Sequence, residues 1–400
     1  MVLISLLAIG TAFNSEGRVY SGLEVFLGKH TDMVKGKRVG LITNQTGADA
    51  DRNSTIDLFH RDPRIRLVAL FAPEHGIRGN LKAGANVPGG KDPSTGLPVY
   101  TLYGGQDHRP TKEALGKIDV LVYDIQDVGS RDYTYIWHLA ECMSAAAENG
   151  KEVIVLDRPN PYGAVTVDGP VTEKKFLSFI GLYPIPRVYG MTVGELACYL
   201  NTEEKIGCRL TIIPMRNYQR GMTWDQTGLP WIPPSPNIPN LSAAYCFAAT
   251  GTIGETGALN IGCGSKASFQ MLATSWIDLN FTSAKLNSLK LPGVKFMPAT
   301  VESTKGKISG VLLSVTNPST FRPSTTETAI LCHLRKYYPD KFSFMADGNR
   351  DRLNRFDKAE GTSSVRNGVN AGLDYTQIAT SWKADQDRFC AKTAKYRIYK

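Results

Sequence analysis

The chain has 400 residues, 42% hydrophobic and 21% charged, and this balance excludes a disordered or coiled-coil protein. Its length exceeds what one hydrophobic core normally supports, so two domains are expected. The formal net charge of +9 favours anionic partners, which include nucleic acid, an acidic envelope surface and carboxylate-bearing substrates; the charge alone does not choose among them.

The first residues form an apolar run, 2–10, of signal-peptide length, and the small residues Thr11 and Ala12 follow it. No lysine or arginine precedes the run, so the signal is incomplete, and a buried first strand is the alternative. We interpret residues 1–12 as a possible signal peptide and expect an exported protein, periplasmic or extracellular. No later apolar stretch is long enough to span a bilayer. The seven cysteines include no Cys-x-x-Cys pair, which indicates mostly free, buried thiols.

Short apolar runs alternate with amphipathic segments through the first half of the chain, which predicts strands alternating with helices. The expected strands are residues 38–44, 66–72, 99–103, 118–125 and 152–157. The expected helices are residues 53–60, a helix that starts at 111–115, and 135–148. This alternation predicts an α/β fold in which helices cover both faces of a parallel sheet.

A carboxylate and an imidazole, Glu74 and His75, directly follow the strand at 66–72. Ligands of open α/β sheets bind beyond the carboxyl ends of the strands, so this pair lies where chemistry is expected. The alternative is that Glu74 caps a following helix or forms an ion pair with Arg78. The glycine- and proline-rich segment 76–98 has the length of a lid or a binding loop.

Other predicted strands of this sheet also end in polar side chains, a repetition that individual helix caps do not require. The residues concerned are Asn44 after the first strand, Asp124, Gln126, Asp127, Arg131 and Tyr133 within 123–135, and Asp157, Arg158 and Asn160 after the strand at 152–157.

The sequence lacks the motifs of several common ligand and catalytic sites. Neither G-x-G-x-x-G nor G-x-x-x-x-G-K-[ST] occurs, so nucleotide binding is not expected, and the absence of G-x-S-x-G argues against an α/β-hydrolase nucleophile. The six histidines show no ligand spacing such as His-x-x-x-His, so we predict no metal and no cofactor.

The second half of the chain begins with a helix at 192–200, for which Thr192 and Glu195 form a capping box, and a strand at 209–215. A proline-dense bend at 229–240 follows, from which Trp231, Ser235 and Asn237 can reach a pocket. We place the domain boundary there, between a catalytic domain at 20–240 and a smaller α+β auxiliary domain at 241–400. The latter is expected to contain turns at 250–265, a strand at 310–316, a helix at 325–338 and a polar tail.

Six ordered motifs resemble a bacterial family first catalogued as a domain of unknown function and later identified as exo-β-N-acetylmuramidases. They are APEHG at 72–76, YDIQDVGSRDYTY at 123–135, LDRPNP at 156–161, GMTVGELA at 190–197, PPSPNIP at 233–239 and FRP at 321–323. The resemblance covers nearly the whole chain from about residue 38. It implies a Rossmann-like first domain, an auxiliary second domain, an active site in the cleft between them, and release of N-acetylmuramic acid (MurNAc) from non-reducing ends of peptidoglycan fragments.

The resemblance also makes the glutamate of APEHG, here Glu74, the leading catalytic candidate. The chain departs from the family pattern at Tyr189, where histidine is expected, and at Cys263, where arginine is expected between two glycines. A missing arginine weakens recognition of the lactyl carboxylate of MurNAc, for which Lys266 or Arg131 are possible substitutes.

Glycoside cleavage needs an acid at the leaving oxygen and a base or nucleophile on the opposite side of the sugar. Glu74 is our candidate for the acid, because a carboxyl group beyond a buried strand can stay partly protonated near neutral pH. Asp124 and Asp127 compete for the second role, and Glu255 is a further candidate. Either aspartate is equally suited to a structural role, and the acetamido carbonyl of the substrate is an alternative nucleophile.

The remaining polar side chains of these strand ends and loops are candidates to bind the sugar. They are Asn44, His75, Gln126, Arg131, Tyr133, Arg158, Asn160, Asn237 and Glu255. His75 is able to hydrogen-bond either Glu74 or a sugar hydroxyl.

The predicted function is thus a glycoside hydrolase that acts on muropeptides or MurNAc–GlcNAc saccharides, with no nucleic-acid partner. Two alternatives remain open: a non-catalytic binding protein for cell-wall sugars, and a hydrolase for another β-linked aminosugar. The sequence does not predict the oligomeric state.

Overall fold

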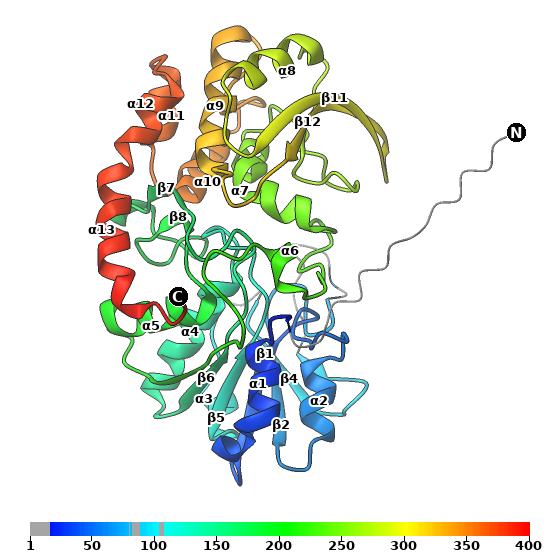
Figure 1. Cartoon of the computed structure of the whole chain (residues 1–400), viewed down its shortest axis with the longest axis vertical. Coiled ribbons are helices and arrows are strands. Elements are labelled where there is room, and N and C mark those ends of the chain that lie inside the picture. Colours follow the sequence, from blue (N-terminus) through cyan, green and yellow to red (C-terminus); the bar gives the residue numbers. More distant parts are fainter. Residues whose placement is uncertain (1–16, 80, 82–88, 104–107) are drawn as a thin grey trace, which may run out of the picture.

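A parallel sheet forms the centre of the lower lobe of the molecule (Figure 1). The computed structural model describes residues 17–79, 81, 89–103 and 108–400. Its main sheet has seven strands in the order β3-β4-β2-β1-β5-β6-β9. The parallel strands are β1 Arg38–Thr43, β2 Arg66–Ala72, β4 Pro98–Thr101, β5 Val120–Asp124, β6 Glu152–Leu156 and β9 Arg209–Ile213; β3 Gly90–Lys91 is an antiparallel edge.

Helices cover both faces of this sheet, which confirms the predicted fold class. One face packs against α1 Gly22–Lys29 and α2 Thr55–Arg61, whose Phe26 and Phe59 rings lie 5.5 Å apart. The opposite face packs against α3 Lys112–Gly116, α4 Tyr135–Glu148 and α5 Val193–Glu203. The predicted capping box at the start of α5 is present, because Thr192 and Glu195 exchange side-chain and backbone hydrogen bonds.

Two smaller elements extend the first domain toward the second. The hairpin-like pair β7 Val167–Val171 and β8 Pro186–Tyr189 is antiparallel, and α6 Trp224–Thr227 precedes the proline-dense bend. Short 3₁₀ helices occur at Thr31–Val34, Lys174–Phe176 and Ala394–Tyr396.

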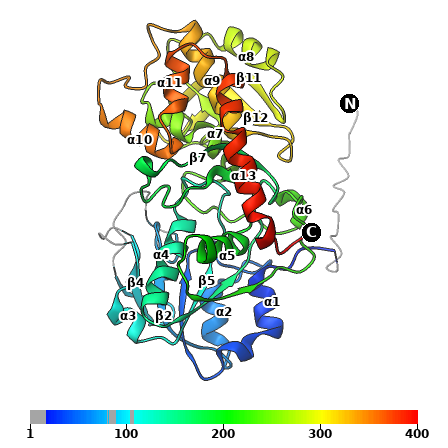
Figure 2. The same ribbon diagram turned by 90° about the vertical axis from the view of Figure 1, so that its left-hand side faces the viewer.

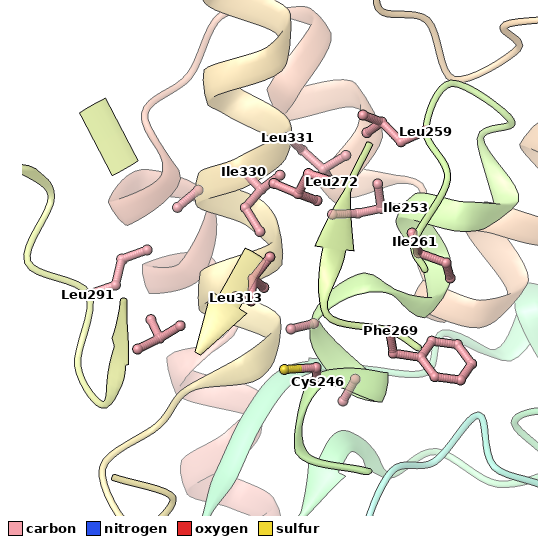
Figure 3. Close-up of a cluster of buried hydrophobic side chains, with 14 of the residues drawn as sticks. Cys246, Ile253, Leu259, Ile261, Phe269, Leu272, Leu291, Leu313, Ile330 and Leu331 are labelled. Atoms are coloured by element: carbon pink, nitrogen blue, oxygen red, sulfur yellow. The ribbon is translucent and has the colours of Figure 1, made fainter. Parts of the chain in front are cut away.

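The second domain places helices around a three-stranded antiparallel sheet of order β10-β12-β11. Its elements are α7 Leu241–Glu255, β10 Met271–Leu272, α8 Leu279–Ser288, β11 Val294–Ser303, β12 Gly306–Val315, α9 Pro323–Tyr337, α10 Asp351–Glu360, α11 Ser364–Asn370, α12 Tyr375–Ser381 and α13 Lys383–Thr393. Leu272, Leu313 and Ile330 from β10, β12 and α9 meet in its core (Figure 3). A smaller α+β second domain is therefore present as predicted.

The expectation of turns at 250–265 is wrong for its first part. Residues 250–255 complete α7, although Thr250, Gly251, Thr252 and Gly254 are poor helix formers. Burial decides the conformation, because Thr250 and Thr252 are almost inaccessible and Thr250 donates to the Phe269 carbonyl at 2.6 Å. The polar tail is likewise mostly helical, as α10 to α13.

The C-terminal tail returns to the first domain instead of remaining with the second. Helix α13 runs beside β7 and spans the two lobes (Figure 2). The Tyr399 hydroxyl donates to Asp157 at 2.6 Å and accepts from the Met215 N–H at 2.9 Å, and Glu195 accepts from the Ile398 N–H. The predicted segment 241–400 therefore contacts both domains at its end.

Removing the Tyr399 hydroxyl is expected to destabilise the protein. Burial raises the pKa of Asp157 to about 6, and the hydrogen bond from Tyr399 opposes that rise. Tyr399→Phe is expected to cost about 1–3 kcal/mol of unfolding free energy, because a buried carboxylate loses a donor. Tyr396→Phe, which removes a hydrogen bond to Glu203 at the surface, is the matched control with a smaller loss. Equal thermal unfolding midpoints for the two variants would contradict this role of Tyr399.

Four further predictions concern the cysteines, membrane spans, the signal peptide and the lid. All seven cysteines are free, as predicted, but only Cys142, Cys208 and Cys246 are buried, so the expectation of mostly buried thiols is wrong. Among the described residues, no helix is long and apolar enough to cross a membrane. The possible signal peptide at 1–12 and most of the predicted lid, residues 80 and 82–88, lie outside the described residues.

Candidate active site

The candidate site lies where the strand order of the main sheet reverses. The chain proceeds from β1 to β2 and β4 on one side, then to β5, β6 and β9 on the other. Neighbouring β1 and β5 end in register, with Thr43 opposite Asp124. The crevice beyond such a reversal is the usual ligand site of an open α/β sheet.

Glu74 is presented by a sharp turn directly after β2. His75 and Gly76 both have positive φ, 72° and 78°, a conformation that suits glycine and is uncommon for other residues. His75 is buried, and its Nδ1 lies 3.0 Å from the Leu81 carbonyl, to which it donates. His75 therefore fixes the turn, while the Glu74 side chain stays half-buried at the strand end.

The alternative partner for Glu74, Arg78, is held elsewhere. Its guanidinium forms ion pairs with Asp57 at 3.0 Å and Asp92 at 2.9 Å. These bonds connect the segment after Glu74 to α2 and to the region before β4, beside a small hollow of about 240 Å³ that His75 also lines.

Three tyrosine hydroxyls lie within electrostatic reach of Glu74. Burial, the charge of Glu74 and a hydrogen bond with Glu74 together raise the pKa of Tyr103 to about 12. Burial also raises the pKa of Tyr133 and Tyr135, and the charges of both Glu74 and Asp127 contribute in each case. Both carboxylates thus lie near the same pair of phenols.

Asp127 is a buried carboxylate that keeps one oxygen without a partner. Its Oδ2 accepts from the Tyr189 hydroxyl at 2.6 Å and the Gly129 N–H at 2.7 Å, whereas Oδ1 has no hydrogen-bond partner. Burial raises its pKa from 3.8 to about 7, against the lowering effect of these two donors. Tyr189, one of the two departures from the family pattern, is therefore a direct partner of this candidate.

Asp124, the other aspartate, is fully engaged within the fold. Both of its oxygens bind Arg158, at 2.6 and 2.8 Å, and Oδ2 also accepts from Thr55. Arg158 further donates to the Ala48 carbonyl at 2.9 Å. This closed pair joins β5, β6 and α2, so Asp124 and Arg158 have a structural role in the fold, and the sugar-binding and catalytic roles predicted for them stay predictions.

Arg131 and Asn160 also form hydrogen bonds within the fold. Arg131 is fully buried and donates to the carbonyls of Pro170, Ile185 and Ala359, so it cannot replace the missing arginine at a substrate carboxylate. The Asn160 amide donates to the Met191 carbonyl at 2.9 Å, and its oxygen accepts from the Tyr162 N–H.

Several buried polar atoms near the strand ends have no partner within the described part of the chain. They are Gln45 Oε1, Gln126 Oε1 and Asp127 Oδ1; the Tyr133 hydroxyl and the Asn44 amide interact instead with Tyr135. Buried polar groups normally pair, so unpaired atoms gathered after β1 and β5 indicate a place where a hydroxyl-rich ligand supplies the missing bonds. Gln126 stays a candidate on this ground, and Asn44 stays a candidate through its contact with Tyr135.

A hollow of about 640 Å³ lies between the two domains. We call it the inter-domain hollow; it is lined by Asp132 and Ile180 from the first domain and by Phe247, Glu255, Cys263 and Arg355 from the second. Glu74 does not line it. Tyr133 connects the two places, because its ring contacts Phe247 at 5.4 Å and its hydroxyl is affected by the charge of Glu74.

Two residues of this region, Arg355 and Tyr103, were not predicted, and Asn237 was predicted to bind the sugar. Arg355 forms an ion pair with Glu255 at 3.0 Å and brings a guanidinium to the inter-domain hollow, near Cys263. Nothing in the polar tail distinguishes Arg355 in the sequence. Tyr103 follows β4, a strand end to which we assigned no site residue. Asn237 lies half-buried in the proline-dense bend, which Tyr135 and Gln45 hold by hydrogen bonds to the Pro234 and Pro233 carbonyls.

The described residues contain no group of three or more histidine, cysteine, aspartate or glutamate side chains arranged to hold a metal ion. The polar side chains around Glu74 and Asp127 are carboxyl, phenol and amide groups. Such groups transfer protons and bind sugar hydroxyls.

The raised pKa of Asp127 predicts a pH-dependent stability. The folded protein binds a proton at Asp127 between about pH 4 and 7, where the unfolded chain has released it, so stability falls as pH rises through this window. Relative to the wild type, Asp127→Asn is expected to be more stable at pH 8 than at pH 5. Thermal unfolding midpoints at both pH values measure the difference.

Asp119→Asn is the control for this measurement. The hydrogen bonds from Arg38 lower the pKa of Asp119, so this group stays ionised at both pH values. The difference in unfolding midpoint between Asp119→Asn and the wild type is therefore expected to be the same at pH 5 and pH 8. If the difference in unfolding midpoint between Asp127→Asn and the wild type is also the same at both pH values, the raised pKa of Asp127 is refuted.

Comparison with known proteins agrees with the motifs from residue 39 to residue 399. Residues 39–242 match the family described as exo-beta-N-acetylmuramidase NamZ, N-terminal, and residues 245–399 match its C-terminal counterpart. The chain is 39% identical over 387 residues to the peptidoglycan beta-N-acetylmuramidase NamZ of Bacillus subtilis (strain 168), covering 96% of this chain and 92% of that protein.

Two solved structures are also similar to this chain. One is a DUF1343 family protein from Bacteroides fragilis NCTC 9343, with a TM-score of 0.89 and 39% identity over 96% of this chain and 100% of that one. The second, from the same organism, has a TM-score of 0.74 and 29% identity, over 96% and 99% of the respective chains. The resemblance drawn from the six motifs is confirmed: the chain belongs to the exo-beta-N-acetylmuramidase NamZ family and is a glycoside hydrolase.

Proposed function

We propose that this protein releases MurNAc from the non-reducing ends of peptidoglycan fragments, with Glu74 as the general acid. The observation that carries the proposal is the half-buried Glu74 at the carboxyl end of β2, next to the switch point between β1 and β5, with the tyrosine hydroxyls of Tyr103, Tyr133 and Tyr135 around it. A sugar hydrolase needs such an arrangement, because the carboxyl group must donate a proton while hydroxyl groups are held around it.

In the proposed reaction, Glu74 gives its proton to the glycosidic oxygen as the bond from that oxygen to the anomeric carbon breaks. Water adds to the anomeric carbon, and its proton leaves to a base, so the products are free MurNAc and the shortened fragment. Tyr103, next to Glu74, is suited to orient this carboxyl group.

Asp127 is the better candidate for the second carboxyl group, because both oxygens of Asp124 are bound to Arg158. The free Oδ1 of Asp127 suits either of two tasks: activation of water, or orientation of an acetamido group that itself attacks the anomeric carbon. Its pKa near 7 places it in the range in which general acid–base groups are effective.

Recognition of the lactyl carboxylate requires a cation, and we propose Arg355 for this task. It lies at the inter-domain hollow together with Cys263, the position where the family pattern has arginine. The substrates would then be muropeptides or MurNAc–GlcNAc saccharides, and the net charge of +9 favours their approach.

Export to the cell envelope is part of the same proposal, because peptidoglycan fragments with free ends occur there. A fusion of residues 1–30 to a reporter that is active only after export is expected to show activity. A reporter that stays inactive while full-length protein accumulates in the cytoplasm would count against export.

The function is tested with a chromogenic β-MurNAc glycoside and with the disaccharide MurNAc–GlcNAc. The wild-type protein is expected to hydrolyse both and to leave GlcNAc–MurNAc intact, since that disaccharide has no MurNAc at its non-reducing end. Binding without hydrolysis would support a non-catalytic sugar-binding protein, and preference for the corresponding β-GlcNAc glycoside would support a different aminosugar hydrolase.

A further inference from the structure

A second large hollow lies on the outer side of the second domain, and we call it the outer groove. Its floor is α9, and its walls are the C-terminal end of α8 and the loop that joins α11 to α12. Its volume is about 610 Å³, within the range of small-molecule binding sites.

The outer groove is separate from the candidate active site. All residues that line it lie between 285 and 375, within the second domain. In Figures 1 and 2, helices α8, α9 and α11, which border it, are at the top of the molecule, away from the main sheet. A ligand in the groove would therefore leave the catalytic crevice open.

Three cations lie around the outer groove: Lys285, Arg335 and Lys336. In the part of the chain that the structure describes, none of them forms an ion pair. The one carboxylate of the groove, Asp374, caps α12 by accepting from the Thr376 N–H at 2.8 Å and its hydroxyl at 2.7 Å. The groove is consequently positive and matches an anionic ligand.

The same groove also offers aromatic and aliphatic surface. Lys285 and Lys336 lie over the Tyr337 ring, at 5.9 and 5.4 Å from its centroid, and Tyr337 is 37% exposed. Leu289 and Leu373 are exposed at 36% and 42%. Cations held at an aromatic, partly apolar surface suit a ligand that has both carboxylates and flat apolar faces, and an acidic pyranose saccharide has both.

We propose that the outer groove is a non-catalytic binding site for a carboxylate-bearing saccharide of the peptidoglycan type, which holds the enzyme on its polymer while the crevice acts on chain ends. The proposal takes the class of sugar from the proposed function. An acidic helical peptide would also meet positive charge in this groove, but the aromatic rings and the compact volume favour a saccharide of about two residues.

The test measures binding of GlcNAc–MurNAc by calorimetry, because this disaccharide carries the carboxylate but is not a substrate for an enzyme that removes terminal MurNAc. The double variant Lys285→Gln/Lys336→Gln is compared with Lys295→Gln/Lys305→Gln, which makes the same charge change on exposed residues of β11 and the β11–β12 turn. The groove variant is expected to bind at least about tenfold more weakly, and the control variant as well as the wild type.

Each result has a definite meaning. Equal binding by the two double variants overturns the proposal, as does displacement of the disaccharide by polyglutamate but not by longer muramoyl saccharides. Hydrolysis of the chromogenic β-MurNAc glycoside is expected to be unchanged in both variants. If the wild type does not hydrolyse that glycoside but the groove variant still loses binding, the proposed function fails and the groove remains a saccharide site.

Discussion

Replacing Glu74 by Gln is expected to lower kcat for MurNAc–GlcNAc by about 10²–10⁴-fold, the usual contribution of a general acid. Gln keeps the size and the hydrogen-bonding ability of the side chain but has no proton to give to the leaving oxygen. The turn that presents residue 74 depends on the backbone of His75 and Gly76, so the variant is expected to unfold at the same temperature as the wild type.

The leaving group distinguishes an acid from other roles. An aryl glycoside with an acidic phenol needs little protonation, so Glu74→Gln is expected to lose much less activity on that substrate than on MurNAc–GlcNAc. Glu113→Gln, at an exposed position on α3, is the matched control and should behave as the wild type. An equal loss on both substrates would assign Glu74 a role other than proton donation, such as nucleophile or positioning group.

Replacing Arg187 by Met is expected to cost about 3–5 kcal/mol of unfolding free energy, because it leaves buried carboxylates without their cation. Arg187 lies on β8 and is inaccessible to solvent. It pairs with Asp132 of the first domain at 3.2 Å and with Glu327 and Glu360 of the second. Urea unfolding monitored by fluorescence measures the loss.

The pH dependence of this variant gives a second readout. Burial raises the pKa of Glu327 well above its usual value, and the neighbouring Glu360 adds to the rise, even with Arg187 beside them. Without Arg187 the carboxyl groups can stay neutral at low pH, so the loss of stability is expected to be smaller at pH 5 than at pH 8.

Two further variants complete this experiment. Adding Glu327→Gln and Glu360→Gln to Arg187→Met is expected to recover part of the loss, because the uncompensated charge is removed. Arg38→Met, which breaks the exposed pair with Asp119, is the control and should change stability little. If Arg187→Met and Arg38→Met lose the same stability, the cluster does not hold the domains together. Asp132, which Arg187 holds in place, also lines the inter-domain hollow. The activity of Arg187→Met is therefore expected to fall together with its stability.

The sequence was sufficient for the pattern of the first domain. Apolar runs such as Val120–Asp124 are buried on both faces of the sheet, and the loops that follow them carry the polar residues. Both features depend on local periodicity, which is readable along the chain. The position of Glu74 was also readable from the chain. Glu74 follows an apolar run and precedes His75 and Gly76, so it lies at a strand end regardless of the tertiary structure. The six motifs together were enough to identify the family.

Only the tertiary structure decided which polar residues are free to act. Asp124, Arg131, Arg158 and Asn160 stand in the same kind of sequence as Asp127, but their partners come from distant segments, such as Thr55 and Ala359. Residue types at a strand end do not show which side chains satisfy one another across the fold.

The second domain shows the same limit. Burial made residues 250–255 helical against their local preference, and packing brought Arg355 to the inter-domain hollow. Strand and helix periodicity is a local property and was read from the chain. Hydrogen-bond partners, burial and the charge of a groove depend on contacts between residues that are far apart in sequence. Such contacts form only in the folded protein, so they could not be predicted from local patterns.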